Sequence, residues 1–300
     1  MHYSAPVQFR KITIVGVGLL GGSLGLAIRR RKLAARVVGY VRRAAAVGEC
    51  RRSGAVDEAT RDLAAAVDGA DLVVLCTPLA QMRPLVARML PRLKRGVIVT
   101  DVGSVKGSVV RELEALVRKA GGEFVGSHPM AGSEKTGVSA AREDMFENAV
   151  CVVTPTRRTV PSTLGKVERF WKAVGGRALR MTPELHDTLV ARSSHLPHLA
   201  AVTLANLVLD PAQPRHQAAL CASGFRDTTR IASGSPEMWR DIALANRGNL
   251  SRALARFIAD LARVRRALDA ADARAVAAAL RSAKRRREAW SAACASPSQE

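Results

Sequence analysis

Three glycines in one short turn, Gly16, Gly18 and Gly21, constrain this chain more than any other feature. They follow a strand-like run at residues 10–15 and precede a helical pattern expected over residues 22–31. In a G-x-G-x-x-G turn between strand and helix, one glycine makes the tight turn, one lets a pyrophosphate approach the backbone, and one permits helix–strand contact. The helix N-terminus then offers free N–H groups to the phosphates. The turn predicts a dinucleotide site formed by Gly16, Gly18, Leu19, Leu20 and Gly21.

Short strand-like runs alternate with helical stretches through the first half of the chain. Strands are expected at residues 10–15, 37–40, 71–77, 97–101, 123–126 and 149–154, with a helix at 107–120. Strands separated by helices pair in parallel through crossover connections. We therefore expect an α/β fold with a doubly wound, Rossmann-type parallel sheet over residues 8–155. Ligands of such sheets bind at the carboxyl ends of the strands.

After about residue 156 the pattern becomes helical, and no further strand is expected. Alanine- and leucine-rich stretches predict helices at residues 162–174, 182–210, 217–223, 237–270 and 272–290. Their apolar faces are wider than one small bundle needs, which favours dimerisation through these helices. The expected organisation is an all-helical substrate and dimerisation domain over residues 156–292 and a disordered tail over 293–300.

The composition argues against several classes of protein. No run of 18 apolar residues is present, and the first ten residues lack the apolar centre of a secretory signal, so we expect a cytoplasmic protein. The five cysteines are widely spaced without a C-x-x-C pair, which argues against disulfides and structural zinc. The net charge of +21 would attract nucleic acid, but the arginines are scattered and aromatic residues make up only 4%. We expect neither a nucleic-acid nor a membrane partner.

The residues after the second expected strand bear on the choice of cofactor. In dinucleotide folds an acidic residue about 20 positions after the glycines binds the ribose 2′-hydroxyl of NAD. Here that position is Val41, followed by Arg42 and Arg43. Guanidinium groups suit a 2′-phosphate and favour NADP over NAD, although an arginine-rich chain would also place such residues on its surface. The remaining expected cofactor contacts are Thr77, Pro78 and Ser104.

Four further motifs follow one another along the chain. They are D-V-G-S-V-K from Asp101, G-S-H-P-M-A-G-S-E from Gly126, S-H-L-P-H from Ser194, and G-F-R-D-T-T-R from Gly224 with M-W-R-D from Met238. In this order and spacing they resemble the prephenate/arogenate dehydrogenase family, over roughly residues 11–290. The resemblance implies NAD(P)-dependent oxidative decarboxylation of prephenate to 4-hydroxyphenylpyruvate in tyrosine biosynthesis, or of arogenate to tyrosine.

The resemblance assigns catalytic roles to two residues. His128 matches the family's catalytic histidine, and a neutral imidazole can accept the proton of the substrate's 4-hydroxyl as hydride leaves. Its loop is expected after the strand at residues 123–126, at the edge where such sheets bind ligands. Ser104 matches the serine that hydrogen-bonds near the same hydroxyl. A lone histidine is more often structural, but His128 lies within a matching segment of nine residues.

The resemblance also implies substrate contacts around an arginine. Arg230 matches the arginine that pairs with a substrate carboxylate, for which a planar guanidinium is suited. Glu134 resembles an acid that can pair with that arginine and gate the pocket. Asp227 would orient Arg230, whereas Arg226 is a weaker substrate contact or part of a structural ion pair. Trp239 either reaches the pocket from a partner subunit or lies in the core.

The segment around two histidines lines the substrate pocket in relatives. Ser194, His195 and His198 belong to it, and the two histidines lie three residues apart at the expected start of a helix. Zinc uses such spacing, but no third ligand or H-E-x-x-H pattern is evident, so no metal is expected. His198 favours prephenate, because arogenate-preferring relatives often carry an apolar residue there. This conflicts with the preference for NADP, which often accompanies arogenate.

Two other functions compete with this one. A β-hydroxy-acid or imine dehydrogenase of the same architecture would use a lysine in its helical domain, but no lysine lies between Lys172 and Lys284. A nucleotide-sensing nucleic-acid-binding protein would keep the fold without the chemistry. The family resemblance favours a homodimeric enzyme with a small-molecule substrate.

Overall fold

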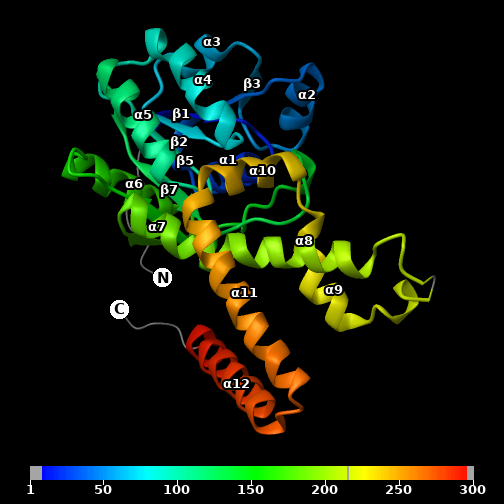
Figure 1. Cartoon of the computed structure of the whole chain (residues 1–300). Helices are drawn as coiled ribbons and strands as arrows, with labels where there is room; N and C mark the ends of the chain where they lie inside the picture. Colours follow the sequence, from blue (N-terminus) through cyan, green and yellow to red (C-terminus); the bar gives the residue numbers. More distant parts are fainter. Residues whose placement is uncertain (1–8, 215, 296–300) are drawn as a thin grey trace. The chain divides into compact units, whose positions relative to one another are not determined.

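The computed structural model describes residues 9–214 and 216–295, and the chain divides after Arg247 into two compact units. The larger unit contains both β-sheets and most of the helices, and the smaller unit consists of the last two helices (Figure 1). Within the described ranges, no helix is both long and apolar enough to cross a membrane.

The main sheet has six parallel strands in the order β3-β2-β1-β4-β5-β6. They are β1 (Phe9–Val15), β2 (Ala34–Tyr40), β3 (Glu58–Thr60), β4 (Leu72–Leu75), β5 (Ile98–Asp101) and β6 (Glu123–Phe124). This order confirms the doubly wound, Rossmann-type expectation. Strand β3 was not expected, because three residues are too few to show a period of two. Val15 lies beside Tyr40 and Leu75, and Leu75 beside Asp101, so the strands end at one edge.

Helices cover both faces of this sheet. They are α1 (Leu19–Arg30), α2 (Ala44–Arg52), α3 (Leu63–Val67), α4 (Leu79–Met89), α5 (Gly107–Lys119) and α6 (Pro161–Ala173). Successive side chains of a strand point to opposite faces. Ile14 therefore joins one buried cluster with α1, α2 and α6, and Val15 joins another with α3, α4 and α5. Helix α1 begins at Leu19 rather than at Gly22 as expected, so the helix starts within the glycine turn.

A second sheet corrects two expectations. It comprises β7 (Gly126–Pro129), β8 (Val150–Thr154) and β9 (Arg177–Arg180), with β7 antiparallel and β9 parallel to β8. The strand at residues 149–154 therefore does not belong to the parallel sheet. Residues 156–292 are not all helical, because β9 follows α6 and returns to β8. Its sequence R-A-L-R, mostly exposed, lacks the apolar run by which strands were recognised.

The remaining helices differ in their bounds from those that the sequence pattern predicts. They are α7 (Pro183–Val190), α8 (Leu196–Val208), α9 (Ser223–Thr229), α10 (Pro236–Ala245), α11 (Arg247–Asp269) and α12 (Ala273–Ala295). Thr182 and Ser235 cap α7 and α10, each followed by a proline at the first helical position. The helix expected over 237–270 is interrupted at Asn246. Helix α12 extends to Ala295, into the tail expected to be disordered, and residues 296–300 lie outside the described part of the chain.

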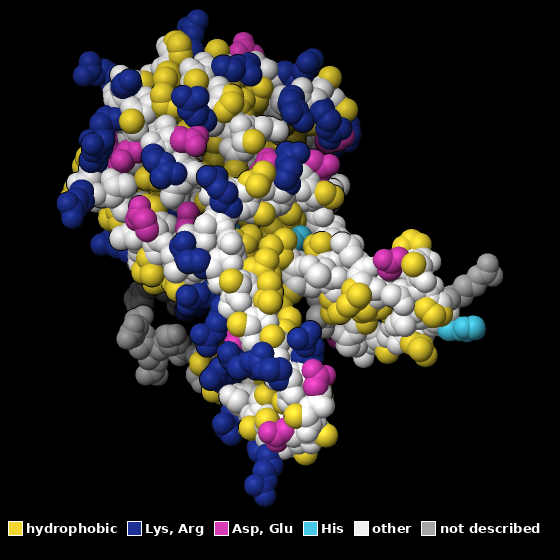
Figure 2. Space-filling model, in the orientation of Figure 1, with side chains coloured by type: hydrophobic (Ala, Val, Ile, Leu, Met, Phe, Trp, Pro, Cys, Tyr) yellow, Lys and Arg dark blue, Asp and Glu magenta, His cyan; other side chains and the backbone are white. Residues whose placement is uncertain are grey.

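Basic side chains are distributed over the surface of the larger unit. On the face shown in Figure 2, Lys and Arg side chains alternate with acidic and apolar ones over the sheet-containing part. Several arginines form surface ion pairs, such as Arg29 with Asp57 and Arg31 with Glu147. The Lys and Arg side chains of this face therefore do not form a single continuous basic stripe.

Candidate active site

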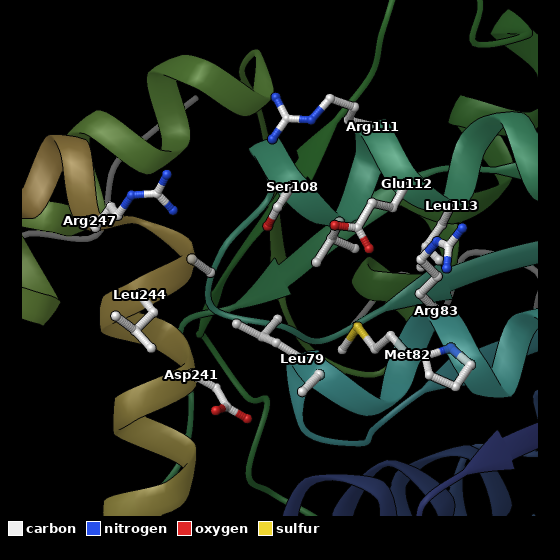
Figure 3. A pocket seen from close by; sticks show the side chains of 14 residues that line it. Leu79, Met82, Arg83, Ser108, Arg111, Glu112, Leu113, Asp241, Leu244 and Arg247 are labelled. Atoms are coloured by element: carbon white, nitrogen blue, oxygen red, sulfur yellow. The ribbon is translucent and has the colours of Figure 1, made fainter.

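Two hollows in the larger unit lie away from the predicted site residues. One, of about 580 Å³, is lined by α4, α5 and α10, with Arg83, Arg111 and Arg247 at its rim (Figure 3). The other, of about 670 Å³, lies beside the starts of α5 and α7. Neither is lined by a residue predicted for cofactor, substrate or catalysis. The predicted site residues therefore lie outside both hollows.

The glycine turn has the geometry that a dinucleotide requires. Gly16 has φ +97°, a conformation that residues with a side chain rarely adopt. A Cβ atom on Gly21 would lie 2.0 Å from the carbonyl oxygen of Gly16, so this position excludes any side chain. A Cβ atom on Gly18 would meet nothing within 4 Å, and α1 begins there without a side-chain cap. Open space and free N–H groups at a helix start fit a pyrophosphate.

The expected cofactor contacts lie at the same edge of the sheet. Val41 is buried and its N–H donates to the carbonyl of Thr60, which fixes the end of β2 beside β3. Arg42 is exposed and has no ion-pair partner in the described part of the chain, whereas Arg43 pairs with Glu49 at 3.1 Å. After β4, the buried hydroxyl of Thr77 has no hydrogen-bond partner among the described residues, and Pro78 precedes α4.

A buried network joins β5 to β7 and positions the segment that contains His128. The Asp101 carboxylate accepts the N–H of Ser127 at 3.0 Å, and the Ser127 hydroxyl donates to the Asp101 carbonyl at 2.7 Å. The ammonium of Lys106, fully buried, contacts Asp101 and donates to the Ser127 carbonyl at 2.8 Å. The half-buried Ser104 lies between these charged residues in the sequence. Because His128 follows Ser127, this network holds it near the carboxyl end of β5.

His128 lies on strand β7, paired with Val152 of β8, and not in a loop as expected. The side chain is only 7% exposed. Burial lowers the pKa of His128 well below 6.5, and the nearby Lys106 ammonium acts in the same direction. At neutral pH the imidazole is therefore uncharged, the form that accepts a proton.

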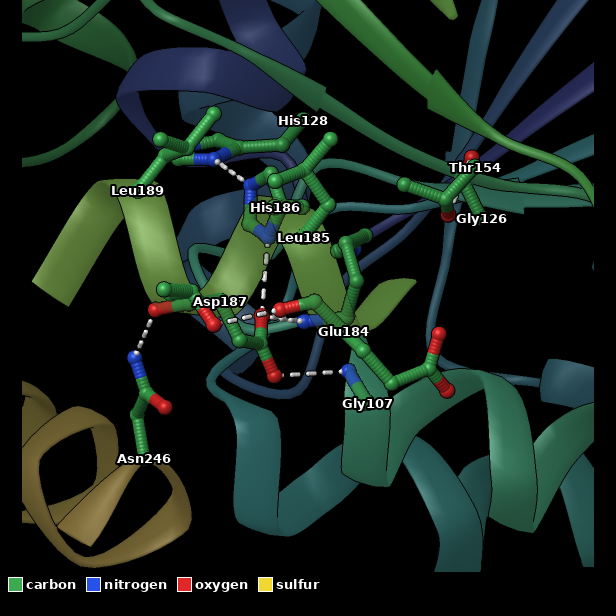
Figure 4. A network of polar contacts seen from close by, with 12 residues as sticks. Gly107, Gly126, His128, Thr154, Glu184, Leu185, His186, Asp187, Leu189 and Asn246 are labelled. Carbon is green, nitrogen blue, oxygen red and sulfur yellow. Dashed lines mark hydrogen bonds and ion pairs between the residues drawn. The ribbon is translucent and has the colours of Figure 1, made fainter. Parts of the chain in front are cut away.

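His186 and Asp187, which the sequence reasoning missed, hold the other side of this imidazole. His128 Nδ1 lies 2.8 Å from His186 Nε2, and His186 Nδ1 lies 2.8 Å from Asp187 Oδ1 (Figure 4). The Asp187 carboxylate also accepts the N–H groups of Lys106 at 2.7 Å and Gly107 at 2.8 Å. The only sequence signal was a histidine followed by an acid near a helix start, which is common on exposed helices.

A π-helical turn, Ala191–His195, joins α7, which carries His186, to α8, which carries His198. In a continuous α-helix, His186 and His198 would be offset by about a third of a turn. One residue inserted by the π turn reduces this offset to almost nothing. Pro197, which has no N–H, interrupts the α-helical hydrogen bonds directly after the turn. His195 and His198 are both buried, and Ser194 is half-buried in the turn.

His198 and Trp239 form a stacked pair within one chain. Their ring centres are 3.5 Å apart at an interplanar angle of 9°, and His195 meets the same indole edge-on at 6.2 Å. A Cβ atom on Gly234 would lie 2.7 Å from the indole nitrogen, so this glycine allows the stack. Trp239 is thus a neighbour of the predicted pocket residues of its own chain. Burial lowers the pKa of His198 below 6.5, so this imidazole is also neutral.

Arg230 lies opposite Glu134, as expected. Its Nη1 is 2.8 Å from Glu134 Oε2, and both side chains are substantially exposed. Asp227 is exposed and does not pair with Arg230. Arg226 is also exposed and forms no ion pair among the described residues. The structure therefore brings Arg230 and Glu134 together and leaves Arg226 and Asp227 outside this contact.

The fold and the site define a class of protein. A Rossmann-type sheet with a complete glycine turn fits a nicotinamide dinucleotide. A buried neutral histidine near the carboxyl edge of that sheet fits proton abstraction coupled to hydride transfer. Within the described residues, no three His, Cys, Asp or Glu side chains are grouped so that they could hold a metal ion. This is the arrangement of a nicotinamide-dependent dehydrogenase.

Comparison with known proteins specifies the family. The family described as prephenate dehydrogenase matches with its nucleotide-binding domain at residues 24–180 and its dimerization domain at residues 182–282. The chain is 34% identical over 266 residues to the cyclohexadienyl dehydrogenase of Zymomonas mobilis, covering 88% of this chain and 90% of that protein. It is 32% identical over 270 residues to the prephenate dehydrogenase of Bacillus subtilis, covering 87% and 71%.

A solved structure agrees. Prephenate dehydrogenase from A. aeolicus, in complex with hydroxyphenyl propionate and NAD+, has a TM-score of 0.87 and 32% identity, covering 96% of this chain and 99% of that one. The chain belongs to the prephenate dehydrogenase family. This confirms the family that the four motifs indicated, and with it an oxidoreductase of the dehydrogenase class.

Proposed function

We propose that this protein catalyses the NAD(P)-dependent oxidative decarboxylation of prephenate to 4-hydroxyphenylpyruvate in tyrosine biosynthesis, with arogenate as the alternative substrate. The observation that carries the proposal is the state of His128, which is neutral and buried within the matching segment. Its Nδ1 is hydrogen-bonded to His186, whereas its Nε2 has no partner among the described residues. The glycine turn from Gly16 to Gly21 would hold the dinucleotide, and Ser104 would lie near the substrate hydroxyl.

The proton of the substrate's 4-hydroxyl is transferred to His128 and is later returned to the same oxygen. Hydride acceptance is the chemistry that the bound nicotinamide supplies. His128 Nε2 takes the proton of the 4-hydroxyl, and departure of the ring carboxylate as carbon dioxide leaves an electron pair that makes the ring aromatic. The phenolate oxygen then takes the proton back. Because no net proton is released, the buried imidazole needs no exit path to solvent.

The substrate would be held at its carboxylates. Arg230 is the proposed partner of one carboxylate, in exchange for Glu134. The buried His195 Nε2 and His198 Nδ1 have no hydrogen-bond partner among the described residues, which is unusual for buried polar atoms and supports a ligand there. Two neutral imidazoles suit the keto acid side chain of prephenate better than the ammonium group of arogenate.

The same proposal extends to cofactor preference and assembly. The free Arg42 supports NADP, whereas Arg43 is already paired with Glu49. We propose a cytoplasmic homodimer, supported by the match to the family's dimerization domain at residues 182–282. Exposed apolar side chains also mark one face of α11, namely Ile258, Leu261 and Leu268.

A four-way assay tests the proposal. Purified protein is given prephenate or arogenate with NAD or NADP, and reduced cofactor is followed by absorbance. We expect turnover, fastest with prephenate and NADP, and a loss of about 10²- to 10⁴-fold in kcat for His128→Asn. His216→Gln, at an exposed histidine, is the matched control and should behave as the unchanged protein. Folded protein that binds the cofactor yet turns over neither substrate would refute the proposal.

A further inference from the structure

Asp187 lies at the centre of a buried network that reaches two histidines of the site (Figure 4). Its side chain contacts His186, which contacts His128. Its backbone carbonyl accepts a hydrogen bond from Asn246 Nδ2 at 2.8 Å, and the same amide nitrogen lies 3.2 Å from His195 Nδ1. One residue is thus joined to both His128 and His195, through one intermediary each.

The first branch of the network, from Asp187 through His186 to His128, determines which nitrogen of His128 carries hydrogen. Burial raises the pKa of Asp187, but hydrogen bonds from His186 and from two backbone N–H groups outweigh it and leave the pKa lowered. An ionised carboxylate only accepts hydrogen bonds, so His186 Nδ1 donates. When His186 is in its neutral form, its one N–H is on Nδ1 and its Nε2 is an acceptor. His128 Nδ1 must then donate, and His128 Nε2 carries no hydrogen.

The second branch, from the Asp187 carbonyl through Asn246 to His195, favours the opposite tautomer of His195. A backbone carbonyl only accepts, so the Asn246 atom that contacts Asp187 is the amide nitrogen, which has a second hydrogen to donate. His195 Nδ1 must accept it. Burial lowers the pKa of His195 to about 4, so the ring is neutral at pH 7 and its hydrogen is on Nε2. His195 Nε2 forms no hydrogen bond of ordinary geometry with a described residue, although the backbone of Ser104 interacts with this imidazole and partly opposes the lowering of its pKa.

We propose that Asp187, acting through a neutral His186 and through Asn246, holds His128 and His195 in opposite tautomers. Nε2 of His128 carries no hydrogen and acts as the base, whereas Nε2 of His195 carries a hydrogen and donates it to an oxygen of the substrate. Asp187, His186 and Asn246 are positioning residues, because none of them is required to touch the substrate. The ionised Asp187 also stabilises the imidazolium that forms while His128 holds the proton. This inference deepens the proposed function and rests on it.

The tautomers can be measured directly. The chain has only six histidines, so nitrogen chemical shifts of ¹⁵N-histidine-labelled protein can be assigned by single substitutions. The resting protein at pH 7.5 should show His128 with hydrogen on Nδ1 and His195 with hydrogen on Nε2. Hydrogen on Nε2 of His128, a doubly protonated His186, or hydrogen on Nδ1 of His195 would each overturn the inference.

Two variants of His186 separate positioning from packing. In His186→Gln the amide oxygen can accept from His128 and the amide nitrogen can donate to Asp187, so the tautomer of His128 and most of kcat should be retained. His186→Leu is similar in size but cannot accept, so His128 should show both tautomers and kcat should fall roughly 10²-fold with little change in KM. Equal activity of the two variants, or an unchanged tautomer in His186→Leu, would contradict the inference.

A variant of Asn246 tests the second branch. Asn246→Leu removes the donor to His195 Nδ1, so His195 should no longer be confined to one tautomer. Since His195 would donate to a substrate oxygen, we expect KM to rise roughly tenfold with kcat changed less than threefold. An unchanged KM together with an unchanged His195 tautomer would contradict this branch.

The nitrogen shifts need no substrate, so the two proposals can fail separately. If the tautomers are as stated but prephenate and arogenate are both inert, the network stands and the proposed function fails. If turnover is observed while His128 carries its hydrogen on Nε2, the function stands and the network inference fails.

Discussion

Arg42 and Arg43 are neighbours in the sequence, but their surroundings differ. Arg43 precedes α2 and pairs with Glu49 on that helix at 3.1 Å. Arg42 is exposed at the end of β2 and has no described partner. An arginine already engaged by a carboxylate is less available to a phosphate, so only one of the two residues fits the role predicted for both.

Cofactor preference should therefore depend on Arg42 more than on Arg43. Replacing Arg42 by Ala removes a charge-assisted hydrogen bond to the 2′-phosphate, worth about 1.5–3 kcal/mol, and should raise the Kd for NADP about 10- to 100-fold. Titration of the protein with NADP and NAD by calorimetry measures this. The Kd for NAD should stay within about twofold, and Arg43→Ala is the matched control. Equal losses for both cofactors would show that Arg42 does not read the 2′-phosphate.

Glu134 pairs with Arg230, the residue proposed to bind a substrate carboxylate, and would compete with the substrate for it. The pair is substantially exposed, and such pairs contribute about 0.2–1 kcal/mol. Replacing Glu134 by Gln removes the competitor and should lower KM by at most about fivefold, whereas Arg230→Gln should raise KM about 10-fold or more. Steady-state kinetics on the preferred substrate measure both changes. Arg226→Gln, outside this contact, is the control, and a larger effect there than at Arg230 would reverse the assignment.

At the scale of elements, the second sheet and the π turn place the histidines. Strand β7 pairs with β8 and is held to β5 through Ser127, so His128 has little freedom. The π turn interrupts the single helix that the sequence suggests over residues 182–210, and its inserted residue changes the angular offset between His186 and His198. A motif such as S-H-L-P-H identifies the residues, but the inserted turn decides which way they face.

Helix α11 carries an exposed apolar stripe that a partner subunit would bury. Ile258, Leu261 and Leu268 are 56%, 53% and 60% exposed, and their spacing of three and seven residues places them on one face. Leu261→Glu should therefore shift a dimer to monomer, because it would bury a charge without a partner. Light scattering coupled to gel filtration measures the mass. Arg256→Glu places the same charge on the opposite face and should leave the mass unchanged. A monomeric unmodified protein would contradict the proposed dimer.

At the scale of the whole molecule, the buried histidines make stability depend on pH. His128, His195 and His198 all have pKa values lowered by burial, that of His195 to about 4. In the unfolded chain they titrate near 6.5, so the unfolded state binds more protons below that pH. The free energy of unfolding should be highest above pH 6.5 and fall as pH decreases. For His195 alone the loss would approach about 3 kcal/mol near pH 4.

Urea unfolding at pH 7.5 and 5 measures this dependence while most carboxylates remain ionised. His195→Gln removes one titrating group and should reduce the difference in free energy between the two pH values. His216→Gln, at an exposed position, should leave that difference unchanged. If stability were the same at both pH values, the buried histidines would not be held neutral by the fold.

Local sequence determined the features that depend on neighbouring residues. The glycine turn requires backbone conformations and close contacts that side chains exclude, so Gly16 and Gly21 identify it without any knowledge of the rest of the chain. The alternation of apolar runs with helical patterns likewise predicted the parallel sheet. His128, Arg230 and Glu134 were identified through motifs whose order resembled a known family.

Only the tertiary structure decided the features that depend on contacts between distant residues. The chain brings His186 to His128 across 58 positions and Asn246 to Asp187 across 59, and no local pattern encodes such contacts. The exposed residues of β9 form a strand because they pair with β8, since their own sequence has no apolar pattern typical of a strand. The tautomers of His128 and His195 are set in the same way, because a buried hydrogen bond constrains a proton only when both partners are in place. The sequence thus predicts which residue is the base, and the fold determines which of its nitrogens is hydrogen-bonded to His186.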